Sequence, residues 1–204
     1  MEYKIERKNI NDIKNLKIQA RANAKELRKS IVEPEKKMLE NDIYKLFINS
    51  LAYKNAKCIA FYVALPDEIS TFEMIEKALT DNKQAAVPRC RTGFNVMDFY
   101  LIKSRDDLEK GHFGILEPSE KCTKIENVNE IGMAVIPALC FDLNGHRIGY
   151  GKGYYDRFLS KFDGVSAGLG YEKMLVKNLP KNRFDKKVDM IITDRRIINV
   201  SAGH

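Results

Sequence analysis

Apolar residues recur every three or four positions through the first fifty residues of the chain, and this spacing predicts helices. We expect residues 1 to about 50 to be helical, with one break over residues 30–34, because a proline pushes the preceding residue out of the α conformation. A second helix then runs from Pro34 to about Leu51. The chain is therefore expected to begin with two consecutive helical segments.

Short apolar runs separated by polar turns follow. The run 58–63 and the run within 131–140 are apolar throughout, which predicts strands buried on both faces. Further strands are expected over 83–88, 97–102, 165–170, 188–193 and 197–200, with helices over 72–79 and 153–162 and a turn-rich connector over 113–118. Since strands alternate with helices at the spacing of βαβ units, the pattern predicts an α/β fold with a mostly parallel central sheet.

Length and composition favour an ordinary globular domain. The chain has 204 residues, 44% of them hydrophobic, which fits one domain with a normal core. No apolar run approaches the ~18 residues of a membrane span, so we expect no membrane partner. The charged start Met1–Lys8 lacks the apolar core of a secretory signal, and we expect a cytoplasmic protein. The four cysteines form no Cys-x-x-Cys pair and are expected to be free thiols, with Cys58 and Cys140 in the core.

The formal net charge is +7, so nucleic-acid binding has to be weighed. The 35 lysines and arginines are, however, spread along the whole chain and interleaved with 28 acidic residues, which is typical of a solvated basic surface. No basic face interleaved with aromatic residues stands out. We therefore expect no nucleic-acid partner, and a positive field that attracts a small anionic substrate such as a nucleotide or a polycarboxylate.

The segment 141–156 carries the densest candidate chemistry. Within seven residues it places Arg147, Gly149, Gly151, Lys152 and Gly153. Glycine lets backbone N–H groups approach an anion, and the two cations add positive charge. The spacing is neither that of a P-loop, since a glycine follows Lys152, nor the Gly-x-Gly-x-x-Gly dinucleotide motif. With Asp156 as a carboxylate for a divalent metal, the segment predicts a polyphosphate and metal site. The alternative is a hairpin turn that happens to be rich in glycine.

Four other charged residues are weaker candidates. Glu68 follows the buried run 58–63, where a carboxylate would orient a polar substrate group or simply favour the start of a helix. Lys25 and Arg28 lie about one helical turn apart and would clamp phosphates, although such pairs are more often surface charges. Asp185 is either a second metal contact or an ordinary loop acid.

Several segments together resemble the 5-formyltetrahydrofolate cyclo-ligase family, also called 5,10-methenyltetrahydrofolate synthetases. The longest and most specific is Ile136–Asp156, and it is preceded in the family's order by Lys25–Lys29, Asp67–Thr71, Ala86–Arg89 and Gly114–Pro118. The resemblance covers about residues 22–200. It implies a three-layer α/β fold of the NagB/RpiA/CoA-transferase-like kind, with an N-terminal helical extension over 1–21 and a single cyclo-ligase domain over 22–204.

The resemblance also implies a reaction that depends on ATP and Mg²⁺. In the family, ATP phosphorylates the formyl oxygen of 5-formyltetrahydrofolate. The other amine nitrogen of the folate then attacks the activated carbon, and phosphate leaves as 5,10-methenyltetrahydrofolate forms. We therefore expect ATP and 5-formyltetrahydrofolate as small-molecule partners of a monomer or weak dimer. The alternative is a divergent nucleotide-binding protein of the same fold without this activity.

Roles for individual residues follow from the same resemblance. ATP would be bound by Lys25, Arg28, Arg147, Ile148, Gly149, Tyr150, Gly151, Lys152, Gly153, Tyr154 and Tyr155. The folate would contact Val63, Glu68, Tyr150, Gly151, Lys152, Gly153 and Tyr154, and the catalytic residues would be Lys152, Arg147 and Glu68. Asp156 and Asp185 would hold Mg²⁺. The family's first helix carries a lysine four residues before its arginine; counted from Arg28 that position is Ala24, with Lys25 shifted by one.

Overall fold

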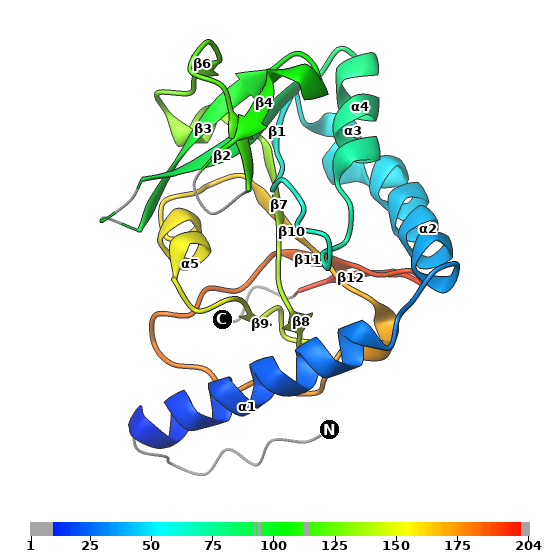
Figure 1. The fold of residues 1–204 in the computed structure, drawn as a ribbon, viewed down its shortest axis with the longest axis vertical. Helices are drawn as coiled ribbons and strands as arrows, with labels where there is room; N and C mark the ends of the chain where they lie inside the picture. The colour runs from blue at the N-terminus through cyan, green and yellow to red at the C-terminus, as the bar shows by residue number, and fades with distance from the viewer. Residues whose placement is uncertain (1–9, 92, 94, 112–114, 201–204) are drawn as a thin grey trace.

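An eight-stranded mixed sheet forms the centre of the protein in the computed structural model, which describes residues 10–91, 93, 95–111 and 115–200 (Figure 1). Its middle consists of five parallel strands, in the order β11 (Met190–Ile192), β10 (Val165–Leu169), β7 (Met133–Ile136), β1 (Cys58–Ala60) and β2 (Gln84–Arg91). Antiparallel strands extend both edges: β12 (Ile197–Asn199) beside β11, then β3 (Val96–Ile102) and β6 (Thr123–Lys124) beyond β2. The predicted α/β fold with a mostly parallel sheet is confirmed.

Helices cover both faces of this sheet. One face is covered by α1 (Ile10–Lys29), α2 (Glu35–Asn49), α3 (Leu51–Asn55) and α4 (Phe72–Thr80), which pack with Ile59 and Val135 in one apolar core. The next residues along the same strands, Ala60 and Ile136, point to the opposite face, where α5 (Tyr154–Leu159) contributes Phe158 to a second core. Because successive strand residues face opposite sides, apolar runs bury both faces. The expected three-layer arrangement is confirmed.

The remaining elements are short. Two small antiparallel pairs lie outside the main sheet, β4 (Leu108–Lys110) with β5 (Leu116–Pro118) and β8 (Cys140–Phe141) with β9 (Arg147–Ile148). Short 3₁₀ helices are η1 (Arg105–Asp107), η3 (Val128–Glu130) and η4 (Glu172–Met174). Helix α1 lies beside the β8–β9 hairpin and contacts β9 and η4 (Figure 1). This contact brings the start of the chain to the segment with the densest candidate chemistry.

The predicted break between the first helices is confirmed, because α1 ends at Lys29 and α2 begins at Glu35. The second helix does not continue to Leu51. It stops at Asn49, and the Ser50 hydroxyl accepts a hydrogen bond from the Tyr53 backbone N–H at 3.2 Å, which caps a new short helix. The part of the first prediction that concerns residues 1–9 lies outside the described residues.

Several predicted boundaries were wrong. Strand β1 ends at Ala60 rather than Val63, and β7 ends at Ile136, just before a proline that has no N–H for the sheet. Cys140 therefore belongs to the β8–β9 hairpin, not to the central strand. Helix α5 ends at Leu159, before Phe162, and the chain turns back toward β10. Strands β4, β5 and β6 were not expected, since two or three residues are too few to show an alternating pattern.

The cysteine prediction is confirmed for all four residues, which are free thiols. Cys58 and Cys140 are buried, and burial raises the pKa of Cys58 to about 11 and that of Cys140 to about 12. Such thiols stay protonated and unreactive near neutral pH. Within the described part of the chain, no helix is long and apolar enough to cross a membrane.

Candidate functional site

The predicted site residues gather beyond the carboxyl ends of β1 and β7, which are neighbours in the sheet. The loop after β1 carries Glu68, and the segment after β7 leads through the β8–β9 hairpin into the glycine-rich loop, residues 149–153. The carboxyl ends of adjacent parallel strands open on the same edge of a sheet, which is where ligands bind in α/β folds. The fold thus brings together two segments that are about eighty residues apart in the chain.

A rigid hairpin, rather than a strand, leads into the glycine-rich loop. Its turn is held by Asp142, which is 1% exposed and whose carboxylate accepts backbone hydrogen bonds from Asn144, His146 and Leu179 at 2.9 to 3.0 Å. Burial opposes ionisation of Asp142, but the hydrogen bonds from His146 and Leu179 lower its pKa below the usual value. The turn of this hairpin contains one glycine, Gly145, and the glycine-rich loop 149–153 lies beyond β9 and is separate from the turn.

Two glycines of the loop have backbone conformations that favour glycine. Gly151 has φ +99° and Gly153 has φ +72°, both in the left-handed region. A β-carbon at Gly151 would lie 3.2 Å from the Arg21 guanidinium, and Gly153 is the N-cap residue immediately before α5. At Gly149, by contrast, a β-carbon would meet no atom within 4 Å. The loop therefore turns through two left-handed residues against an arginine of α1.

Two cations that we did not predict contact this region from α1. Arg21 Nε donates a hydrogen bond to the Gly149 carbonyl oxygen at 2.9 Å, and Lys17 Nζ lies 2.5 Å from the Asp185 carboxylate. Lys17 and Arg21 are four residues apart and so lie on one face of the helix. They have the four-residue lysine-to-arginine spacing that the resemblance implies for the first helix. This pair lies seven residues before the position counted from Arg28. Both lie in the segment 1–21 that was expected to be an extension.

The two cations that were predicted on α1 are placed differently. Lys25 Nζ lies 5.9 Å from the centre of the Tyr150 ring, within reach of a cation–π contact at the glycine-rich loop. Arg28 is 7% exposed, and its guanidinium donates to the backbone carbonyls of Asp67, Ala138 and Leu139. Lys25 therefore reaches the loop, whereas Arg28 points into the protein.

Glu68 is the buried acid of the site, at 6% exposed. Its Oε2 accepts a hydrogen bond from the Leu65 backbone N–H at 3.0 Å, and the Tyr150 hydroxyl interacts favourably with the carboxylate. Burial raises the pKa of Glu68 above its usual value, although the Leu65 hydrogen bond and the positive charge of Arg28 oppose this. Burial and the negative charge of Glu68 likewise raise the pKa of Tyr150. The interaction between Tyr150 and Glu68 links the two loops of the site.

The two predicted metal ligands lie in neighbouring segments, and each is paired with a cation. Asp156 Oδ1 accepts hydrogen bonds from Arg147 at 3.0 Å and from the Lys186 backbone N–H at 3.1 Å, which places it next to the segment of Asp185. The Asp185 carboxylate is bound by Lys17. Among the described residues, no group of three or more His, Cys, Asp or Glu side chains could hold a metal by itself.

The remaining predicted residues divide between the surface and the core. Lys152 is exposed, and Tyr154 is half-buried, with a pKa raised by burial and by the charges of Cys90 and Glu117. Val63 and Ile148 belong to the core, and Tyr155 packs edge-on against Phe158 with ring centres 6.4 Å apart. Ile148 is buried and Tyr155 is partly buried, and the packing of both side chains helps to position the loop.

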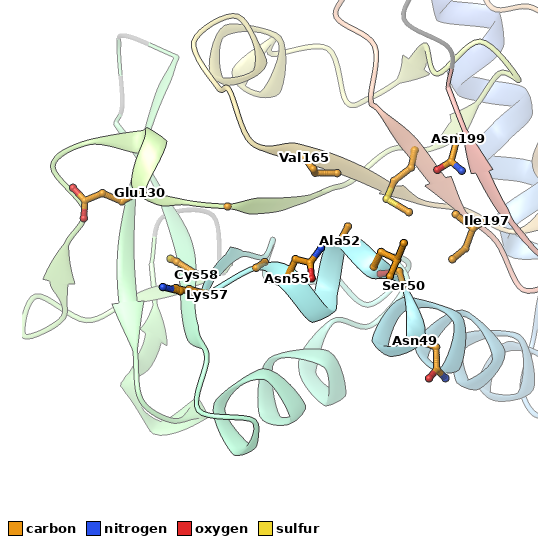
Figure 2. A pocket seen from close by; sticks show the side chains of 14 residues that line it. Asn49, Ser50, Ala52, Asn55, Lys57, Cys58, Glu130, Val165, Ile197 and Asn199 are labelled. Atoms are coloured by element: carbon orange, nitrogen blue, oxygen red, sulfur yellow. The ribbon is translucent and has the colours of Figure 1, made fainter.

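A separate pocket of about 860 Å³ opens at the opposite edge of the sheet (Figure 2). It is lined by the residues that begin the parallel strands, among them Cys58, Val165 and Met190, and by Lys57 and Glu130 at its polar rim. None of the predicted site residues lines it. The pocket and the candidate site therefore lie at opposite ends of the strands.

A basic glycine-rich loop and a buried carboxylate at the carboxyl edge of a parallel sheet give this α/β protein a candidate anion-binding site. Residues 13–194 match the model of the 5-formyltetrahydrofolate cyclo-ligase family, and the chain belongs to this family. The match begins within the segment 1–21 and includes Lys17 and Arg21.

Individual relatives agree with this assignment. The chain is 28% identical over 171 residues to 5-formyltetrahydrofolate cyclo-ligase from Haemophilus influenzae, a match that covers 82% of this chain and 91% of the relative. The mouse enzyme of the same name is 28% identical over 151 residues, covering 69% and 74% of the two chains. The NMR structure of 5,10-methenyltetrahydrofolate synthetase from Aquifex aeolicus superimposes with a TM-score of 0.81 at 28% identity, over 93% of this chain and 95% of that one.

Proposed function

We propose that the protein converts 5-formyltetrahydrofolate to 5,10-methenyltetrahydrofolate, with ATP as co-substrate and ADP and phosphate as further products. The observation that carries the proposal is the contact between Tyr150 of the glycine-rich loop and the buried Glu68. This contact joins the glycine-rich loop, which is suited to bind phosphates, to a carboxylate that is suited to bind an uncharged or protonated ring system. Because the chain belongs to the cyclo-ligase family, we assign ATP to the phosphate side and 5-formyltetrahydrofolate to the carboxylate side.

The reaction needs accurate positioning more than it needs a protein nucleophile. A formyl oxygen is a poor leaving group, and its phosphorylation makes it a good one. In the first step, the formyl oxygen attacks the terminal phosphorus of ATP, and the bond from that phosphorus to the bridging oxygen breaks. In the second step, the folate amine attacks the formyl carbon, loses its proton and displaces phosphate. Holding the two substrates in line supplies much of such a rate enhancement.

The glycine-rich loop would receive the phosphates. Lys152 is exposed in the loop, and Lys25 contacts the Tyr150 ring beside it. Arg21 holds the loop through the Gly149 carbonyl. Exposed backbone at Gly149, where no side chain crowds the surface, offers close approach to a phosphate. We assign charge neutralisation of the transferred group to Lys152, with Arg147 holding Asp156 in place.

The folate would lie on the Glu68 side. A desolvated carboxylate with a raised pKa is suited to accept the proton that the attacking amine loses. Tyr150 orients that carboxylate and remains 42% exposed, so its ring is available to the substrate. Val63, at 8% exposed, would form part of the apolar wall.

Mg²⁺ fits the donor set only together with ATP. Magnesium is commonly bound by one or two carboxylates plus phosphate oxygens and water, and Asp156 and Asp185 are two carboxylates in neighbouring segments. The Lys17 ammonium donates a hydrogen bond to the Asp185 carboxylate, and it would have to share this carboxylate with the ion or move away when the ion binds. Bound there, the ion would neutralise phosphate charge. The chain's own residues would then orient both substrates and move the proton to Glu68.

We further propose that the protein works as a cytoplasmic monomer or weak dimer, without nucleic-acid partners. The compartment needs its own measurement, because a relative from Arabidopsis thaliana, 22% identical, is named as mitochondrial. Its location can be followed by fractionation of the native host. Gel filtration with light scattering reports the oligomeric state.

The decisive assay mixes the purified protein with MgATP and 5-formyltetrahydrofolate and follows the near-ultraviolet absorbance of the methenyl product. We expect an ATP-dependent rise, and Lys152→Ala should abolish it while the melting temperature stays near that of the wild type. ATP binding without any absorbance rise would instead indicate a nucleotide-binding protein without the cyclo-ligase activity. Wild-type rates in Lys152→Ala would refute the role of the loop lysine.

A further inference from the structure

Arg28 connects three segments that build the site. From α1, its Nη1 donates to the Asp67 carbonyl at 3.2 Å, and its Nη2 donates to the carbonyls of Ala138 and Leu139 at 2.6 and 3.1 Å. Asp67 immediately precedes Glu68, and Ala138 and Leu139 lie between β7 and the hairpin that leads into the glycine-rich loop. One guanidinium thus holds the loop of Glu68 to the segment that positions the phosphate side.

Burial of the Arg28 charge costs free energy unless the charge has stabilising partners. Arg28 is 7% exposed, and burying a cation is costly unless hydrogen bonds and opposite charge compensate for lost water. Three carbonyls compensate in part, while its Nε–H is buried without a hydrogen-bond partner among the described residues. A methionine would fill similar space without this cost. A further favourable interaction is therefore expected for the Arg28 charge, and the nearby carboxylate of Glu68 provides it.

Glu68 is the acid that this charge influences. The groups that interact with the carboxylate come from four elements, and they are Arg28 of α1, Tyr150 of the glycine-rich loop, Tyr155 of α5, Tyr62 after β1 and Asp67 of its own loop. Only Arg28 among them is a cation; Lys25 lies on the Tyr150 ring. Without Arg28, burial and the negative charge of Asp67 would still disfavour the carboxylate form of Glu68, and no cation among these groups would oppose them.

We propose that Arg28 is a positioning residue for Glu68, which it holds against the glycine-rich loop through the Asp67, Ala138 and Leu139 carbonyls and keeps as a carboxylate through its charge. This rests on the proposed cyclo-ligase function. It differs from a nucleotide-binding role for Arg28, because the guanidinium is occupied by backbone carbonyls inside the protein. A lysine could keep the charge, but its single ammonium lacks the planar fork that reaches separate carbonyls.

The test compares Arg28→Met, Arg28→Lys and Glu68→Gln in the full chain by the cyclisation assay across pH. We expect Arg28→Met to lower kcat by about 10- to 100-fold, the scale of effects from small misplacements. Its acid limb in kcat/KM should move to higher pH, since the desolvated carboxylate has lost its cation. Arg28→Lys should return the acid limb toward wild type without restoring kcat. Arg28→Met added to Glu68→Gln should cost little more than Glu68→Gln alone.

Three results would overturn the proposal. They are an acid limb of Arg28→Met that coincides with that of the wild type, full kcat in Arg28→Lys, and a raised KM for ATP at unchanged kcat. Ile43→Ala, in the core of α2 at 0% exposed, is the stability control: it should lower the melting temperature without moving the acid limb. If Arg28→Met does not fold, the kcat of Arg28→Lys still tests the proposal, because full kcat in that variant would overturn it. An inactive wild type would refute the proposed function itself, whereas an unmoved limb in an active variant refutes only the role of Arg28.

Discussion

Alanine in place of Gly151 tests whether the glycine-rich loop needs its left-handed conformation. The residue has φ +99°, and the new β-carbon would lie 3.2 Å from the Arg21 guanidinium. A residue other than glycine pays roughly 1–2 kcal/mol in left-handed backbone. Arg21 can yield because the contact involves the flexible end of its side chain, so the backbone cost should dominate. For a chain of this size, that cost corresponds to a fall in melting temperature of about 2–8 °C.

Gly149→Ala is the matched control in the same loop. Its φ is not positive, and the added β-carbon would meet no atom within 4 Å, so stability should remain within about 0.5 kcal/mol of wild type. Both variants should be compared by thermal unfolding, and Gly151→Ala should also be compared with the wild type by initial rates at varied ATP. Gly151→Ala is expected to raise KM for ATP as well, because any shift of Arg21 releases the Gly149 carbonyl that it holds. Equal losses in the two variants, or no loss in Gly151→Ala, would refute the argument.

Three further predictions concern other contacts of the site. Lys17→Met should raise KM for ATP several-fold and leave KM for the folate unchanged, since it removes a cation beside the proposed phosphate and metal site; equal changes in both KM values would count against a role on the nucleotide side. Tyr150→Phe removes the hydroxyl whose interaction favours the Glu68 carboxylate, so the pKa of Glu68 should rise further and the acid limb of kcat/KM should move to higher pH; an unchanged limb would argue against this interaction. Asp142→Asn should lower the free energy of unfolding by about 1–3 kcal/mol at pH 7 through loss of a buried ionic acceptor. Because the pKa of Asp142 is lowered in the folded protein, this stabilisation is present above its unfolded pKa of about 3.9 and is lost as the pH falls through the folded value. Denaturant titrations should therefore converge for the two proteins in acid, and a constant difference would argue against an ionised Asp142.

The central strands could be predicted because each is a short apolar run buried on both faces, as at β7 and β11. Their ends could not. Strand β1 stops at Ala60 although apolar residues continue to Val63, because hydrogen-bonding partners, not hydrophobicity, limit the ladder. The short strands β4, β5 and β6 carry too few residues for a period to appear.

The candidate site residues divide in the same way. The glycine-rich loop and Glu68 were recognisable because glycines with flanking cations, and an acid after a buried strand, are uncommon local patterns. Of the cations of α1, Lys25 and Arg28 were expected but Lys17 and Arg21 were missed, since all four lie on one amphipathic helix of twenty residues. Which of them reaches the loop depends on how the helix is rotated and where it crosses β9. The four-residue spacing of Lys17 and Arg21 was the signal that could have found them.

The sequence by itself determined the α/β class, the buried strands, the break before Pro34 and the chemistry of the glycine-rich loop, because these depend on local periodicity and residue type. Tertiary structure alone decided the rest. It buried Arg28 on backbone carbonyls, brought Lys17 to Asp185, and joined Tyr150 to Glu68 across about eighty residues of chain. Contacts between distant segments follow from the packing of whole elements, and side-chain patterns within one element do not encode them.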